Sequence, residues 1–499
     1  MAKTLAEINE KIRKGDAVVV RADQMPRIVA DNGPKKAAQE VDVVTTGTFG
    51  AMCSSGAILN FGHSNPPIKM QKVWLNEVEA YGGLAAVDAY IGATELSLDR
   101  GMEYGGGHVV EDLIAGRLIS LRTSSYGTDC YPTRKMETTF TLEDLNQAYM
   151  FNPRNAYQRY NAAVNTTDRK LRTYMGTLLP RAGNINFAGT GEISPLLNDP
   201  KYRSIGFGTK IFLGGAEGRI IGEGTQHSPQ TGFGNIAVKG ELRQMDTQYV
   251  KGVTIPDYGT SLMLGIGVPI PILDEEMAQS TAITNDQIET NLLDYGVART
   301  DRPTLRKVSY SELISGRVEL MDRSVKCAPL SSFKIAYEIM GELARWIDEK
   351  RFYFAEGVEN LPGQRVFKPM KVKKKMPNVA EVMTANVFTA RVDDSLEDVS
   401  SLMVGKGVDQ IPVVDDQGMV AGIVTSLDFT KAVASKKKRL SEVMTPKVVT
   451  SKPSEHIDEV SRRLERYGFN STPVVDSEGR IIGIITVSDI NKAWGRLAK

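Results

Sequence analysis

Cysteine is scarce in this chain, with three copies among 499 residues. Cys53, Cys130 and Cys327 form no Cys-x-x-Cys pair, so one chain can build neither a disulfide framework nor a four-thiolate zinc or iron–sulfur site. We therefore expect no metal and no cofactor held in the chain. Any cysteine that has a function is expected to act as a thiol.

Long apolar runs and a charge of one sign are also missing. No stretch approaches the ~20 apolar residues that cross a bilayer, and the first residues, MAKTLA, lack the apolar centre of a signal peptide. The net charge is only +1, which does not favour nucleic acid as a partner. We expect a cytoplasmic protein that binds a small molecule or another protein, with no membrane and no nucleic acid.

The last third of the sequence contains a repeat with a constant offset of 61 residues. VAEVMT at 379–384, IPVVD at 411–415 and GIVTSLD at 422–428 return as LSEVMT at 440–445, TPVVD at 472–476 and GIITVSD at 483–489. Each copy predicts a short hairpin and then a helix, with an aspartate in the first helical turn. A unit this short cannot bury its apolar face alone, so we expect the two copies to pack on each other.

This repeat resembles the tandem cystathionine-β-synthase (CBS) domain, or Bateman module, because both copies carry Gly-x-x-Thr-x-x-Asp. The resemblance covers roughly residues 377–496. It implies an adenosyl compound such as S-adenosylmethionine or an adenine nucleotide, with Asp428 and Asp489 on the ribose and Thr425 and Thr486 near phosphate or sugar. The alternative is that the two aspartates only cap helices. CBS pairs regulate rather than catalyse and commonly dimerise, so we expect a homodimer.

The domain limits can be predicted from composition. Residues 362–378 combine three prolines with a lysine cluster and indicate a basic linker between a unit at 1–361 and CBS copies at 379–435 and 436–499. The first unit is predicted to be α/β, with a large glycine-rich mixed sheet. Its clearest expected helices are Leu5–Lys14 and Phe333–Phe352, and Ala17–Arg21 and Val41–Thr46 are expected strands.

Three segments of the first unit are rich in glycine: 45–56, 104–108 and 206–218. Glycine lets backbone amides point into a site, and such arrangements bind carboxylates, phosphates or oxyanions. None of the three matches a P-loop or a dinucleotide-binding fingerprint. The alternative is that these glycines serve only turns.

The three cysteines differ in their sequence surroundings. Cys130 lies in SSYGTDCYPTR, a predicted loop in which Arg134 can stabilise a thiolate. Cys53 lies in the first glycine-rich segment, in a predicted strand-to-helix turn whose amides would do the same. Cys327 is flanked by apolar residues and is expected to fill the core.

The first unit resembles the homocysteine-biosynthesis (HcyBio) family. The resemblance extends from about residue 8 to 361 and rests on TTGTFGAMCSSG at 45–56, YGTDCYP at 126–132, GTKIFLGGA at 208–216 with GTQH at 224–227, and GIGVPIPIL at 265–273. It implies an L-aspartate semialdehyde sulfurtransferase that makes homocysteine. It also implies a cysteine persulfide, assigned to Cys130 with Cys53 as a second thiol, and a ferredoxin-like iron–sulfur partner that supplies electrons.

The implied chemistry makes specific demands on side chains. A persulfide that adds to an aldehyde gives an oxyanion needing amide or cationic partners, and reductive loss of that oxygen needs two electrons from an external donor. His108 and His227 are candidates for proton transfer, although each can equally be structural. The candidates for binding substrate are Arg134, Lys210, Arg181 and the amides of Gly214 and Gly215.

Two other functions remain open from sequence alone. IMP dehydrogenases also join a reactive cysteine to a CBS pair, but their pair is inserted in a barrel and their Gly-Ser-x-Cys-x-Thr loop is absent here. The chain could also be a non-catalytic sensor of an adenosine ligand, because the CBS repeat is independent of catalysis. A persulfide on Cys130 distinguishes the enzyme from the sensor.

Overall fold

The computed structural model describes residues 2–298, 301–365, 368, 370 and 377–497. The chain forms two compact units, Met1–Lys368 and Pro369–Lys499. The predicted linker at 362–378 lies partly outside the described residues. Its first residues belong to the first unit, because Leu361 is buried there and Arg365 forms a 2.6 Å ion pair with Glu223. No helix among the described residues is long and apolar enough to cross a membrane.

The helices that frame the first unit begin and end where local chemistry predicts. Helix α1 (Leu5–Lys14) starts with a capping box at Thr4 and stops at Gly15, whose φ of 84° is left-handed. Helix α8 (Phe333–Asp348) starts at Ser332, whose hydroxyl accepts a hydrogen bond from the Ile335 amide. It is four residues shorter than expected. Its buried face has the predicted members: Ala336, Ile339, Met340, Leu343 and Trp346.

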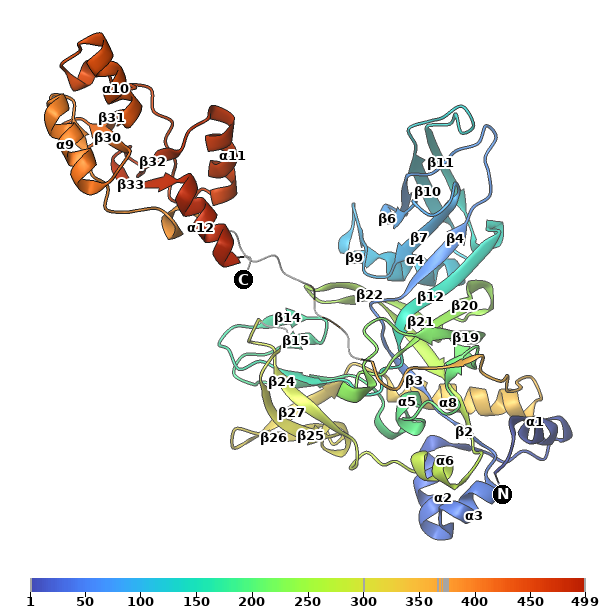
Figure 1. Ribbon diagram of the computed structural model, residues 1–499. Coiled ribbons are helices and arrows are strands. Elements are labelled where there is room, and N and C mark those ends of the chain that lie inside the picture. Colours follow the sequence, from blue (N-terminus) through green and yellow to red (C-terminus); the bar gives the residue numbers. More distant parts are fainter. Residues whose placement is uncertain (1, 299–300, 366–367, 369, 371–376, 498–499) are drawn as a thin grey trace. The chain divides into compact units, whose positions relative to one another are not determined.

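A 15-stranded sheet dominates the first unit (Figure 1). The order along it is β11 (Lys135–Phe140), β10 (Ile119–Ser124), β5 (Lys72–Leu75), β6 (Val78–Tyr81), β7 (Asp88–Gly92), β4 (Gly56–Asn60), β12 (Gln147–Asn155), β20 (Ile236–Glu241), β19 (Ala216–Glu223), β18 (Lys210–Leu213), β22 (Gly259–Gly267) and β21 (Val250–Ile255). Strand β3 (Thr48–Ala51) pairs with β22, and β8 (Leu96–Ser97) joins β6 to β9 (Gly101–Gly105). The pairs within it are antiparallel, and hairpins join several neighbours, including β5–β6, β10–β11, β18–β19 and β21–β22.

Parallel pairs occur in the smaller sheets, which make the unit mixed as predicted. The six-stranded sheet has the order β25 (Thr304–Ser309), β24 (Glu289–Asp294), β13 (Ala162–Val164), β16 (Ile185–Phe187), β27 (Arg323–Pro329) and β26 (Arg317–Leu320). The pairs β13–β24 and β16–β27 are parallel. A three-stranded sheet joins β1 (Val19–Arg21), β2 (Val43–Thr45) and β23 (Pro269–Pro271). Two-stranded ladders are β14 (Leu171–Thr173) with β15 (Gly176–Leu178), and β17 (Gly206–Phe207) with β28 (Glu359–Asn360).

Helices cover the sheets only locally. Figure 1 shows α2 (Met25–Asn32), α3 (Pro34–Glu40) and α6 (Glu275–Ser280) gathered near α1. Helix α4 (Gly106–Ile114) packs against β21 and β22, and α8 against β22 and β3. The short helices α5 (Pro195–Asn198) and α7 (Tyr310–Ile314) complete the unit. Two helices therefore contact strand β22.

The second unit is the predicted pair. Copy one contains β29 (Ala390–Arg391), α9 (Leu396–Lys406), β30 (Gln410–Val414), β31 (Val420–Thr425) and α10 (Ser426–Ser435). Copy two contains α11 (Ile457–Tyr467), β32 (Ser471–Val475), β33 (Ile481–Thr486) and α12 (Val487–Leu497). Each hairpin and following helix lies where the repeat predicts it.

The two copies exchange their first segments. Thr384 makes two backbone hydrogen bonds of 2.9 and 3.0 Å with Ile484 of copy two, and Thr445 makes the reciprocal pair with Ile423 of copy one. Val379 accordingly belongs to the hydrophobic core of copy two. Neither copy completes its core alone, which confirms that the repeat folds as a pair.

Candidate active site

A cavity of about 380 Å³ surrounds Cys53 in the first unit. Its walls come from both large sheets: the end of β3, the end of β12, the β14–β15 turn, the β21–β22 turn and the segments after β16 and β27. The described lining residues are Thr48, Gly50, Ala51, Met52, Cys53, Ser54, Arg154, Tyr157, Tyr160, Tyr174, Met175, Ala188, Gly189, Ser194, Gln226, Tyr258, Leu330 and Ser331. This cavity combines a thiol, one cation and several hydroxyl groups.

Cys53 lies in a tight turn between two strands. The turn joins β3 to β4, so the predicted strand-to-helix turn is wrong, and no helix follows to present its first amides to the thiol. The glycines that suggested a helix start instead allow close packing: a Cβ on Gly50 would lie 2.9 Å from the Ser331 hydroxyl. The thiol is half-buried at the cavity wall.

The turn that carries Cys53 is fastened on both sides. The Ser261 hydroxyl donates a hydrogen bond of 3.1 Å to Cys53 Sγ, and Ser54 Oγ lies 3.0 Å from the Arg154 carbonyl oxygen, to which it donates. The Met52 amide donates to the Leu262 carbonyl at 2.7 Å. These hydrogen bonds hold the Cys53 sulfur in place at the cavity wall.

Arg154 is the one charged side chain among the described residues that line the cavity, and no described aspartate or glutamate lines it. Its Nε donates to the Thr225 hydroxyl at 3.0 Å, which leaves other guanidinium N–H groups for the cavity. Sequence reasoning missed this residue. A single cation without a neighbouring acid gives the cavity the charge that suits an anionic ligand.

Tyrosines form the aromatic wall of the cavity. Tyr157 packs edge-to-face on Tyr160, with ring centroids 5.0 Å apart, and the Tyr174 hydroxyl lies 2.7 Å from that of Tyr295. Burial raises the pKa of Tyr157, while the charge of Arg154 and a hydrogen bond to it lower it. Burial also raises the pKa of Tyr160 and, to a smaller extent, that of Tyr258. These phenols are therefore neutral near pH 7.

Cys130 lies apart from this cavity, at an exposed turn between β10 and β11. Its Sγ is 3.4 Å from the Thr128 hydroxyl, and Thr128 and Tyr131 exchange two backbone hydrogen bonds across the turn. Arg134 is exposed and packs over Gly127, where a Cβ would lie 2.9 Å from Arg134 Nε. The loop is as predicted, and the thiol is open to an incoming molecule.

The other residues expected to bind substrate lie outside the Cys53 cavity. Lys210 forms a 3.0 Å ion pair with Glu217 and lines a second cavity, of about 340 Å³. Arg181 is exposed and paired with Asp168. Gly214 and Gly215 have φ values of 60° and 95° in the β18–β19 turn, and the Gly214 amide donates to the Gly265 carbonyl. Their geometry is that of a turn.

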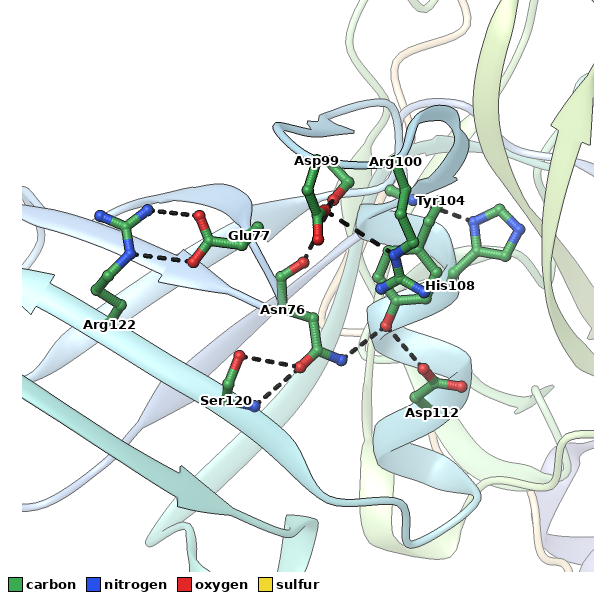
Figure 2. Close-up of polar contacts among 11 residues, drawn as sticks. Asn76, Glu77, Asp99, Arg100, Tyr104, His108, Asp112, Ser120 and Arg122 are labelled. Carbon is green, nitrogen blue, oxygen red and sulfur yellow. Dashed lines mark hydrogen bonds and ion pairs between the residues drawn. The ribbon is translucent and has the colours of Figure 1, made fainter.

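His108 caps a helix, and the cavity around Cys53 does not include it. Its Nδ1 accepts a hydrogen bond of 3.2 Å from the Gly105 amide at the start of α4, and burial lowers its pKa. Figure 2 shows its ring against Tyr104, whose hydroxyl donates to Asp112 at 2.7 Å. The network locks α4 to the β8–β9 hairpin.

The glycines that precede His108 are not an anion nest. The amides of Gly106 and Gly107 already donate to the carbonyls of Glu95 and Ala93. A Cβ on Gly107 would lie 2.2 Å from the Ser261 carbonyl oxygen. These glycines therefore let α4 press on the strand residue that holds Cys53.

His227 is buried, and backbone groups occupy both of its ring nitrogens. Nδ1 accepts a hydrogen bond of 3.0 Å from the Asn235 amide, and Nε2 is 3.1 Å from the carbonyl oxygen of Pro362. The cavity includes its neighbour Gln226 but not the imidazole itself. His227 thus fastens the start of the linker to a loop of the cavity.

The remaining predicted residues have clear settings. Cys327 is buried in the core, and burial raises its pKa to about 12, which keeps it a thiol. In the CBS pair, Asp428 and Asp489 each accept hydrogen bonds from the backbone amide and the hydroxyl of Thr425 and Thr486, respectively. One carboxylate oxygen of each aspartate therefore caps its helix.

Comparisons with known proteins cover almost the whole chain. Residues 17–354 match the family model described as "Homocysteine biosynthesis enzyme, sulfur-incorporation", and residues 379–435 and 440–496 match the CBS domain. A protein of Methanosarcina acetivorans named L-aspartate semialdehyde sulfurtransferase is 48% identical over 495 residues, 99% of each chain. A protein of the same name from Methanocaldococcus jannaschii is 45% identical over 508 residues, again 99% of each chain.

The chain also matches solved structures of CBS domain pairs. One is a CBS domain pair in complex with 5′-methylthioadenosine and S-adenosyl-L-methionine, 31% identical, with a TM-score of 0.24 over 24% of this chain and 98% of that one.

Proposed function

We propose, from the premise that this chain belongs to the homocysteine biosynthesis enzyme family that incorporates sulfur, that it converts L-aspartate semialdehyde to L-homocysteine. The observation that carries this proposal is the Cys53 cavity, in which a thiol and a lone cation line the same walls. The family membership sets aside the IMP dehydrogenase-like reading and the non-catalytic sensor.

The residues divide the reaction between two thiols. Cys130 is exposed and accepts sulfane sulfur as a persulfide from the donor. Cys53, which Ser261 holds at the cavity wall, takes the outer sulfur atom of that persulfide and leaves Cys130 as a thiol. The resulting Cys53 persulfide attacks the aldehyde carbon in the cavity. Arg154 holds the substrate carboxylate, which fixes the aldehyde beside the thiol.

The product requires electrons from outside the chain. Loss of the aldehyde oxygen as water takes two electrons, and cleavage of a sulfur–sulfur bond to the carrier cysteine takes two more. We propose that a ferredoxin-like iron–sulfur protein supplies them, because three cysteines cannot hold a cluster of four thiolates. A homodimer and a place in the cytoplasm remain part of the proposal.

The direct test of the loading thiol is mass spectrometry. After anaerobic treatment with polysulfide and alkylation, we expect an added sulfur atom on the Cys130 peptide and none on the Cys327 peptide, whose thiol is buried. Cys130→Ser should lose that signal and its turnover with the sulfane donor, while its fold is unchanged. Full turnover of Cys130→Ser with the same donor would show that the sulfur enters elsewhere.

We propose that an adenosyl compound bound to the CBS pair regulates the site through the linker. The segment that leads from the first unit is tied to the cavity: Pro362 contacts His227, and Arg365 pairs with Glu223. Gln226, next to His227, lines the cavity. Displacement of this segment would therefore move the loop that contains Thr225 and Gln226. Thr225 accepts a hydrogen bond from Arg154, so the displacement would also affect Arg154.

Binding of S-adenosylmethionine and of AMP to the full chain tests the CBS site. Asp428→Asn and Asp489→Asn keep an oxygen that caps the helix but lose the charge, and we expect each to weaken binding at least about tenfold. Asp476→Asn is the matched control, because Asp476 only accepts hydrogen bonds within its hairpin and with Arg480. The affinity for S-adenosylmethionine and AMP is measured by calorimetry. If it is unchanged in both test variants, the two aspartates only cap their helices.

A further inference from the structure

The oxyanion formed in the proposed reaction needs a proton donor in the cavity. All three histidines of the first unit are described, and none lines the cavity around Cys53. His108 and His227 are occupied by backbone groups, and His63 stacks on Tyr131 beside the Cys130 turn. Apart from Cys53 and Arg154, the ionisable side chains among the described lining residues are those of Tyr157, Tyr160, Tyr174 and Tyr258.

Tyr157 differs from the other tyrosines of the wall in its neighbours. It lines the same cavity as Cys53 and Arg154, and charge interactions with both residues influence its pKa. Tyr160 and Phe233 hold its ring edge-to-face, with centroid distances of 5.0 and 6.4 Å. This packing holds the phenol ring in the wall of the cavity that also contains Cys53 and Arg154.

The other phenols are less suited to this task. The Tyr174 hydroxyl is engaged with that of Tyr295 at 2.7 Å, and the Tyr160 ring packs edge-to-face on Tyr174 with centroids 6.4 Å apart. Tyr258 also feels Cys53, but its side chain is 41% exposed at the cavity rim. Water at the rim competes with a donor there, whereas Tyr157 is held inside.

We infer that the Tyr157 hydroxyl is the general acid that protonates the aldehyde oxygen as sulfur adds to the aldehyde carbon. This inference rests on the proposed function. A carbon–sulfur bond forms, the carbonyl π bond opens, and its electron pair takes the phenolic proton, so an O–H bond forms as the phenol O–H bond breaks. No electron donor takes part in this step. The phenolate left behind is paired with the Arg154 guanidinium and regains its proton from solvent.

The test compares Tyr157→Phe with the wild type in an anaerobic assay of aspartate semialdehyde, a sulfur donor and a strong reductant. General acids contribute about 10²–10⁴-fold, so we expect kcat to fall at least about a hundredfold. Persulfide loading, circular dichroism and the alkylation rate of Cys53 should be unchanged. Tyr81→Phe, which removes a hydroxyl from an exposed tyrosine outside the cavity, is the matched control and should behave like the wild type.

The pH profile separates an acid from a structural tyrosine. Wild-type kcat should fall as pH rises through the raised pKa of Tyr157, because the phenol is then lost. Fluorotyrosine at position 157 keeps the ring and lowers the phenol pKa, so this alkaline limb should move to lower pH. Tyr157→Phe with wild-type kcat, or a limb that fluorination does not move, overturns the inference. A wild type that never converts aspartate semialdehyde overturns the proposed function instead.

Discussion

Replacing Cys53 by alanine is expected to lower turnover of L-aspartate semialdehyde at least about a thousandfold, as loss of a covalent nucleophile commonly does. Cys53 carries the only thiol among the described residues that line its cavity. Its Ser261 hydrogen bond and its anchored turn hold that sulfur at the wall before substrate arrives. Without it, sulfur loaded elsewhere has no carrier beside the aldehyde.

The measurement is homocysteine formed in the anaerobic assay, with thermal unfolding as a check of the fold. Cys327→Ala is the matched control: it also removes a thiol, but from a buried strand position, so it should cost stability and leave turnover nearly unchanged. If Cys53→Ala retained turnover while Cys130→Ala lost it, the exposed β10–β11 turn would be the place of carbon–sulfur bond formation.

The parts of the fold that local sequence determines could be predicted. The 61-residue offset fixed the CBS pair, because equal strings in one register must form equal elements. The limits of α1 followed from Thr4 and Gly15, whose effects are local. Val379 and its copy-two counterpart each pack in the core of the other copy. This could not be predicted, because the sequence does not show which copy each segment contacts.

The site was only half predictable. The scarcity of cysteine identified the candidate thiols. Which of them lies at the cavity depends on the β3–β4 hairpin, and a glycine-rich string does not reveal whether a hairpin or a helix follows it. The glycines of 104–108 were expected to bind an anion. They instead allow close contact with Ser261, and their amides donate hydrogen bonds to carbonyls distant in sequence. Contacts between segments distant in sequence therefore determine both the hairpin at Cys53 and the close contact at Ser261.

Arg154 and the tyrosines were missed for the same reason. Tyr157, Tyr174 and Tyr258 come from three separate turns and meet only after the two sheets pack together. The usable signal was the density of tyrosine and arginine in RNAYQRY at 154–160, which is unusual for an exposed strand end. Such a cluster indicates a partly buried polar site, although it does not reveal the partner of the cation.

Arg154→Gln is expected to raise KM for L-aspartate semialdehyde about a hundredfold, because a charge-assisted contact worth roughly 2–3 kcal/mol is lost. The side chain has no described acid beside it in the cavity, so its charge is available to the substrate carboxylate. Arg154→Lys should recover part of the affinity, since a lysine restores the charge but not the planar pair of donors.

Propanal, which has the aldehyde but no carboxylate, separates carboxylate binding from every other task of Arg154. Any effect of Arg154→Gln on Tyr157 reduces turnover of both aldehydes, whereas loss of a carboxylate contact reduces only that of the semialdehyde. The ratio of the two kcat/KM values should therefore fall about a hundredfold in Arg154→Gln. Arg181→Gln should leave that ratio unchanged, because Arg181 is exposed and paired with Asp168. An unchanged ratio in Arg154→Gln and a changed one in Arg181→Gln would place the substrate carboxylate at the surface and remove it from the Cys53 cavity.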